Sequence, residues 1–298
     1  MSGPRLCVAV GEGGGVGLRD LFRRKPPPPP PASPGQRFHQ DRARMFDLAG
    51  TGILVEMLAM PAEARNSAWQ DAFFDFAWTA SVAFAEPQTF IGPDGFPYLR
   101  LDLPHPGPFE SQCLGNVAGD CLENGVGAAF FARPDDPPER PQYVLSFGLI
   151  DSLVRFDSPW GDPIDVEEAS LPEAEGVFDV EEGAASRTMI VKEAHQVLVG
   201  APSADFLPPY AARALASHLE MVWSLEDPRV QLIADMQMRP HRSLVIGRKR
   251  GEFPDGAPID DMSQMLLWYL TPLRSVMLMP EDWRLDQMTP LRELAEAR

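Results

Sequence analysis

The sequence has few of the residues from which catalytic and metal sites are usually built. It contains three cysteines and five histidines among 298 residues, and no histidine occurs in an H-E-x-x-H motif. Cys113 and Cys121 are separated by seven residues, which is wider than the spacing of a zinc knuckle. Ser146 lacks the G-x-S-x-G context of a hydrolase nucleophile. The sequence therefore predicts no metal site and no cofactor.

The sequence also lacks the segments that direct a protein into or across a membrane. No apolar run reaches the roughly 18–20 residues of a bilayer-spanning helix, and the N-terminus shows no signal-peptide order. Three cysteines are too few for a disulfide framework, which favours a reducing compartment. We therefore expect a cytoplasmic protein without a transmembrane segment, and the abundance of Ala, Pro, Arg and Gly is typical of a bacterial one.

Charge is distributed unevenly along the chain. The net charge is −17, yet residues 1–45 carry +5, so the remaining chain carries −22. A body this acidic repels a phosphate backbone, which argues against nucleic-acid binding. Residues 1–45 include six consecutive prolines, and we expect a disordered basic tail. Within it, residues 16–25 have one apolar edge beside basic side chains, which is compatible with weak contact to a membrane surface.

The order of apolar runs and turn residues after this tail predicts an α+β fold. Helical spacing and alternating patterns are distinguished by their periods of 3.6 and 2 residues. In the first half the expected elements are a strand at 52–60, a helix at 62–84, a strand pair at 88–103, a helix at 108–123, and strands at 126–132 and 142–149.

The second half repeats the same order of expected elements. They are a strand at 185–200, a helix at 208–225, strands at 229–237 and 243–250, a helix at 259–270 and a strand at 275–279. Both halves then match the ferredoxin-like (βαββαβ) plan, each with an antiparallel or mixed sheet and helices on one face. Ferredoxin-like sheets often pair, so a homodimer is compatible with this plan.

The expected domains follow from composition. The segment 157–183 holds ten acidic residues and no Lys or Arg, a density of like charge that favours a solvated linker over a packed core. The prediction is therefore a tail at 1–45, an N-terminal α+β half at 46–156, an acidic linker at 157–183 and a C-terminal α+β half at 184–298.

The C-terminal half also resembles a known family. Over residues 206–283, a helix, a hairpin, the run "LVIG", a second helix and "VMLMPEDW" follow one another. This succession resembles that of the bacterial enhanced-serine-sensitivity family, whose members also pair two small α/β halves. The resemblance implies the two-half plan and carries over no site residue.

One basic cluster stands out on the acidic body, formed by the turn "RPHRS" at 239–243 and the run "RKR" at 248–250. Such a cluster suits a small anionic ligand or an acidic segment of a partner protein, and it can equally offset neighbouring acids. A histidine held between prolines and a tryptophan outside the periodic segments are further surface candidates. The candidate binding residues are Arg239, His241, Arg242, Arg248, Lys249, Arg250, His105 and Trp160.

Two functions from different classes fit these observations. The first is a non-catalytic cytoplasmic module that binds a protein partner or a small molecule, since no catalytic motif is recognisable. The alternative is a hydrolase-like enzyme with a carboxylate and histidine site in the cleft between the halves, built on His105 or His241. Converging acids and a histidine in a cleft would favour the enzyme, and an exposed apolar patch beside the linker would favour the binding module.

Overall fold

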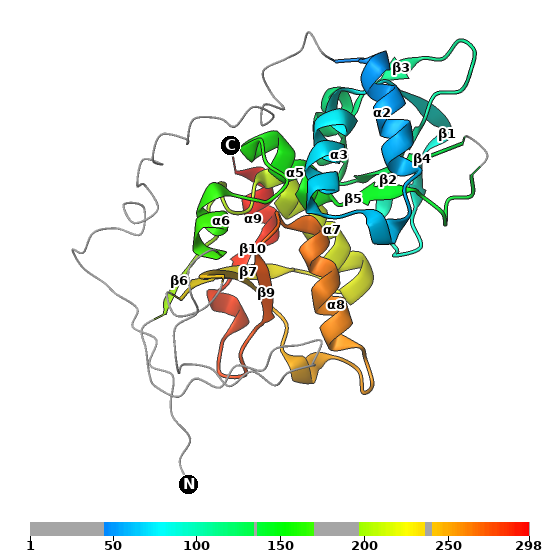
Figure 1. Ribbon diagram of the computed structural model, residues 1–298. Coiled ribbons are helices and arrows are strands. Elements are labelled where there is room, and N and C mark those ends of the chain that lie inside the picture. The colour runs from blue at the N-terminus through cyan, green and yellow to red at the C-terminus, as the bar shows by residue number, and fades with distance from the viewer. Residues whose placement is uncertain (1–44, 134–135, 170–196, 236–239, 298) are drawn as a thin grey trace.

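The computed structural model describes residues 45–133, 136–169, 197–235 and 240–297 of the chain. This part is a mixed α+β fold, as the sequence predicts, with two mixed sheets surrounded by helices (Figure 1). The predicted tail up to residue 44, the acidic residues 170–183 and Arg239 lie outside the described residues. Within the described ranges, no helix is both long enough and apolar enough to cross a bilayer.

The first sheet has the strand order β3-β1-β2-β4-β5. β1 pairs antiparallel with β2 and with β3. β2 pairs parallel with β4, because helix α4 makes the crossover between them, and β4 pairs antiparallel with β5. The elements are β1 (Val82–Ile91), β2 (Pro97–Asp102), β3 (Ser111–Gln112), α4 (Leu114–Asn124), β4 (Gly127–Phe131) and β5 (Tyr143–Leu145).

The second sheet has the order β10-β7-β8-β9, and β6 pairs with β7 beside β10. β7 and β8 form an antiparallel hairpin, and β8 pairs parallel with β9 after a helical crossover. Both sheets thus share a hairpin followed by a crossover to a parallel strand. The elements are β6 (Leu198–Gly200), β7 (Arg229–Ala234), β8 (Arg242–Ile246), α8 (Ile259–Met265), η4 (Leu266–Tyr269), β9 (Ser275–Leu278) and β10 (Thr289–Pro290).

The other helices pack on and between the sheets, with α5 and α7 lying between them in Figure 1. Their buried side chains join one continuous core that runs from Leu54 to Leu291. A smaller cluster around Val245 and Met279 lies on the opposite face of the second sheet. The helices are α2 (Leu48–Leu58), η2 (Ala62–Ala64), α3 (Ser67–Thr79), α5 (Phe147–Phe156), α6 (Pro163–Ala169), α7 (Pro209–Trp223), η3 (Arg250–Glu252), η5 (Leu285–Gln287) and α9 (Leu291–Glu296).

The strand predicted at 52–60 is wrong, because this run forms helix α2. Asp47 caps the helix, since its Oδ1 accepts a hydrogen bond from the Ala49 amide at 2.9 Å. The run 52–60 is apolar apart from Glu56, and a short apolar run fits a buried strand and a helix equally well. The strand predicted at 142–149 is half right: β5 ends at Leu145, and Ser146 then caps α5 by accepting from the Leu149 amide.

The ferredoxin-like strand order is not found in the described residues. In that plan the first strand lies between the third and the fourth, but here β8 and β9 are direct neighbours and β6 lies beyond β7. The first sheet has no strand at the position of α2. Residues 185–196 of the longer strand expected before α7 lie outside the described residues.

The acidic segment expected to be a solvated linker is folded over its first part. Residues 163–169 form α6, and the side chain of Asp165 in this helix is fully buried. Like charge disfavours packing only where no opposite charge compensates it. Arginines of the second sheet, distant in sequence, provide that compensation here.

Aromatic side chains fill the contact between the two sheets. Trp268 stacks on Phe96 with ring centroids 4.5 Å apart, and its indole nitrogen donates to the Tyr98 hydroxyl at 3.0 Å. Beside them the Nδ1 of His218 lies 3.1 Å from the Tyr269 hydroxyl. His218 is buried, and desolvation lowers its pKa below 6.5.

Replacing His218 is expected to remove a pH dependence of stability. Below about pH 6.5 the unfolded chain binds a proton on this imidazole that the folded chain resists, so the free energy of unfolding falls as pH falls. Urea unfolding at pH 7.5 and at pH 5.5 should show a smaller loss for His218→Gln than for the wild type. The exposed His105→Gln is the control, and equal losses in the two variants would contradict the prediction.

Candidate functional site

The structure divides the predicted basic cluster into two groups at opposite ends of β8. His241 and Arg242 precede or open the strand, and residues 248–250 follow its end. At about 3.3 Å per residue, β8 separates the groups by roughly 15 Å. The five members of the cluster that the structure describes therefore do not form one surface for an anion.

The group after β8 is engaged by neighbouring loops. Arg248 donates to the Trp223 and Glu252 carbonyls, and its guanidinium lies 4.2 Å from the centroid of the Phe253 ring. The Lys249 ammonium donates to the Glu281 carbonyl at 2.6 Å. Arg250 is exposed and pairs with the Asp260 carboxylate. These contacts hold surface turns together.

The group before β8 belongs to a buried ionic cluster. Arg242 and Arg274 both donate to the carboxylate of Asp165, the latter from Nε at 3.1 Å. Asp162 lies 3.7 and 3.6 Å from the same two guanidinium groups. Arg274 also donates to the carbonyl of Phe206 and stacks 4.3 Å from the centroid of its ring. Two arginines thus converge on two aspartates of the acidic segment.

Local sequence determines how α6 enters this cluster. The Asp162 carboxylate accepts from the Ile164 amide at 2.9 Å, which satisfies an amide of the first helical turn. Pro163 suits the first helical position because it has no amide hydrogen to leave unpaired. Gly161 has a φ of 106°, and a Cβ there would lie 2.7 Å from the Pro272 carbonyl oxygen. Glycine is therefore required where the chain turns into α6.

A second contact joins the C-terminal end of α6 to the start of β8. The Nδ1 of His241 lies 3.2 Å from Oε1 of Glu168, and the imidazole is buried. Two of the predicted binding residues, His241 and Arg242, therefore face acids of the chain itself. These contacts favour the interpretation in which the basic cluster offsets neighbouring acids.

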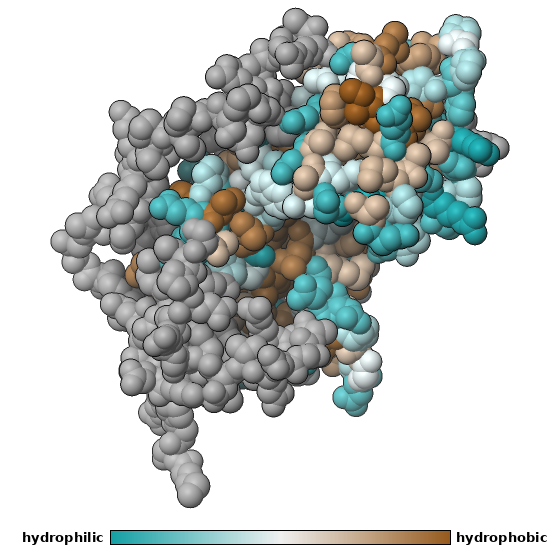
Figure 2. Space-filling model, in the orientation of Figure 1, coloured by the Kyte–Doolittle hydropathy of each residue, from teal (hydrophilic) through white to brown (hydrophobic). Residues whose placement is uncertain are grey.

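The exposed side of α6 carries the apolar Ile164 and Val166 beside Glu167, and Asp165 lies on its buried side. Trp160, Ile164, Val166 and Leu273 are 40, 46, 38 and 43% exposed. Leu273 follows Pro272, whose carbonyl lies against Gly161, so Leu273 lies near the turn that leads into α6. Figure 2 shows apolar side chains at the position that α6 occupies in Figure 1. We call these four residues the α6 surface.

A neighbouring ion pair fixes α5 beside the cluster. Arg155 donates to both carboxylate oxygens of Asp151, at 2.8 and 2.6 Å, and to the Asp205 carbonyl at 2.8 Å. The Tyr210 hydroxyl donates to the same carboxylate, and burial raises the pKa of that phenol. The pair ties the end of α5 to the loop that leads into α7.

Several of these residues could not be found from the sequence. Trp160 was predicted as a surface residue and is exposed, but Ile164, Val166, Leu273 and Arg274 carry no motif. His105 is exposed in the loop between β2 and β3, far along the chain from α6. Within the described ranges, no group of three or more His, Cys, Asp or Glu residues could hold a metal ion.

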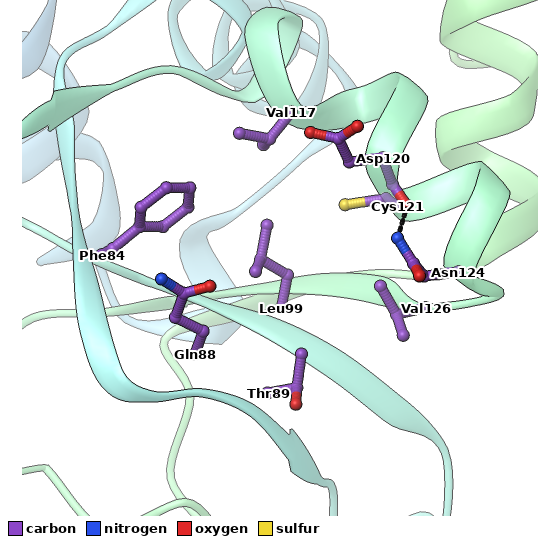
Figure 3. Close-up of a pocket in the computed structure, with 9 residues that line it drawn as sticks. All are labelled: Phe84, Gln88, Thr89, Leu99, Val117, Asp120, Cys121, Asn124 and Val126. Atoms are coloured by element: carbon purple, nitrogen blue, oxygen red, sulfur yellow. Dashed lines mark hydrogen bonds between the residues drawn. The ribbon is translucent and has the colours of Figure 1, made fainter.

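A pocket of about 350 Å³ lies on the first sheet (Figure 3). It forms where β1 bulges away from β2, because five steps along β1, from Phe84 to Thr89, face two along β2. Pro87 within this stretch is the sequence signal for the bulge, since proline in a strand is confined to edges and bulges. The lining residues are Phe84, Gln88, Thr89, Leu99, Val117, Asp120, Cys121, Asn124 and Val126.

Comparison with protein-family models, with curated proteins and with solved structures finds no match to this chain. The function is therefore inferred from the geometry of the described residues.

Proposed function

We propose that this protein is a non-catalytic, cytoplasmic binding module that recognises a protein partner through the α6 surface. The observation that carries the proposal is the orientation of α6. A surface helix ordinarily turns its apolar side chains inward and its charged ones to water. Here Asp165 is buried, whereas Ile164 and Val166 are exposed.

Two features of this region, the buried ion pairs and the exposed apolar side chains, support a recognition role. Burying carboxylates costs solvation free energy, and the ion pairs with Arg242 and Arg274 offset that cost only in a defined geometry. That geometry holds α6 in one orientation and presents its apolar side. Apolar side chains grouped on a surface, with an aromatic among them, are typical of protein-binding sites.

The hydrolase-like alternative has less support from the described residues. It requires a histidine and carboxylates together in a cleft between the halves. His105 is exposed on a loop of the first sheet, and His241 is buried beneath α6 against Glu168. Aromatic side chains occupy the contact between the sheets.

Site-specific photo-crosslinking in the cells that encode the protein tests the proposal. A photoreactive amino acid at Val166 should give a discrete adduct with one protein, and Trp160→Ala combined with Leu273→Ala should abolish it. The matched control carries the same photoreactive group at the exposed Asp255. We expect no adduct there.

The mass of the adduct identifies the kind of partner. A mass twice that of the chain shows that the α6 surface binds a second copy, and any other mass identifies a different protein. Absence of an adduct at Val166, or the same adducts at Val166 and Asp255, would overturn the proposal.

A further inference from the structure

The pocket on the first sheet is a site of a different kind, and it does not depend on the proposed function. Its inner wall is apolar and comes from both the sheet and α4. Val117 and Cys121, one turn apart, point from the helix toward Leu99 on β2 in Figure 3. Its volume of about 350 Å³ lies within the range of about 300–1,000 Å³ usual for small-ligand sites.

The thiol in this wall acts as an apolar group. Cys121 is buried, and desolvation, with the nearby charge of Asp120, raises the pKa of its thiol to about 12. A thiol with this pKa stays protonated at neutral pH, so it is neither a nucleophile nor a metal ligand there. The wall therefore offers van der Waals contact to the body of a ligand.

The polar groups that line the pocket include one carboxylate, beside the amides of Gln88 and Asn124 and the hydroxyl of Thr89. Asp120 is the one charged residue among the nine that line it, and Figure 3 shows its carboxylate projecting from α4 on the same side as the Cys121 thiol. The Asn124 amide nitrogen donates to the Asp120 backbone carbonyl at 2.8 Å. Asn124 retains its Oδ1, an acceptor, and one N–H of its amide for a ligand.

No arginine or lysine of the described residues forms an ion pair with Asp120. The neighbouring Glu123 on α4, by contrast, pairs with Arg213 at 2.9 Å. An anionic ligand in this pocket would meet the Asp120 carboxylate without a compensating cation. A positively charged nitrogen would meet a carboxylate and an amide oxygen, on a chain whose net charge of −17 attracts cations.

The geometry points to a binding site for a small organic amine, with the ammonium group at Asp120 and an apolar body against Leu99, Val117 and Cys121. This ligand class is opposite in charge to the small anion that the basic cluster predicts. The bulge of β1 makes the room for the body, and α4 supplies the charge.

Two probes of the same shape and opposite charge test the inference. Isotope-labelled full-length protein is titrated with phenethylamine and, separately, with hydrocinnamate, and backbone amide shifts are followed by NMR. Phenethylamine should shift the resonances of Val117, Cys121 and Val126, and hydrocinnamate should not. Asp120→Asn should weaken phenethylamine binding about fivefold, the loss expected for an exposed ion pair.

Two further variants distinguish the pocket from general attraction of cations to an acidic protein. Asp255→Asn removes an exposed carboxylate elsewhere and should leave phenethylamine binding unchanged. Thr89→Trp fills the mouth from β1 and should abolish the shifts. Equal binding of the two probes, an equal effect of Asp120→Asn and Asp255→Asn, or no shift at the pocket with either probe would overturn the inference.

Discussion

Alanine in place of Gly148 is expected to prevent stable folding. Gly148 lies in the first turn of α5, where the chain passes against the end of η4. A Cβ at this position would lie 1.8 Å from the carbonyl oxygen of Leu270 and 2.3 Å from its carbonyl carbon. These are backbone atoms and cannot rotate away, so α5 would have to separate from η4. We expect a loss of at least about 4 kcal/mol in the free energy of unfolding, which would leave little soluble protein.

A second glycine of the same fold gives the matched control. Gly119 lies within α4, and a Cβ there would have no heavy atom within 4 Å. Gly119→Ala should therefore stabilise the protein by about 0.5–1 kcal/mol, because alanine restricts the unfolded chain and favours the helix. Soluble yield and urea unfolding measure both variants. A Gly148→Ala protein as stable as the wild type would show that α5 and η4 do not approach this closely.

Removing the carboxylate of Asp165 is expected to have the second-largest effect. Arg242 and Arg274 both donate to it, and Asp165→Ala would leave these two buried guanidinium groups with Asp162 as the one carboxylate described beside both. Breaking a buried pair costs about 3–5 kcal/mol, because one carboxylate then compensates two buried positive charges. Unfolding monitored by circular dichroism should show that loss.

The control for Asp165 is an exposed pair of the same chemistry. Arg284 Nη2 and the Asp286 carboxylate lie 2.6 Å apart, with both side chains largely in water. Asp286→Ala should leave the free energy of unfolding nearly unchanged, because water screens an exposed pair. If the two variants lose the same stability, α6 is not held by its buried charges. Adding acetate should partly restore Asp165→Ala, because the ion can enter the space that the side chain leaves.

The elements that the sequence predicted well are those whose ends are marked by glycine, proline or other turn residues. Helix α4 ends where Asn124-Gly125 predicts, since Gly125 takes the left-handed conformation with φ 68°. Strands β7 and β9 also lie within their expected ranges, and β8 begins one residue before its range. Strand β1 begins at Val82, before the predicted strand pair at 88–103 and inside the end of the helix predicted at 62–84. The strand predicted at 52–60 was wrong because the apolar residues of this run show no clear helical period by which to recognise a helix.

The site was harder to predict because its parts are far apart in the chain. Asp165 and Arg274 are 109 residues apart, and composition around Asp165 indicates a solvated segment. The orientation of α6 follows from the pairing of Asp165 with Arg274, and no motif in the sequence of the helix itself indicates it. The order of strands in each sheet is likewise a property of long-range pairing, so the alternation of elements suggested a ferredoxin-like plan that the strand order of the described residues does not follow.

The continuous core between the two sheets has a consequence for how this chain can evolve. A unit that folds alone can be duplicated, fused or exchanged between genes as a separate cassette. Here Phe96, in the turn between β1 and β2, and Trp268, in η4 between β8 and β9, stack face to face inside the same core. Either sheet without the other would expose that aromatic layer to water. We therefore expect the two sheets to be retained together.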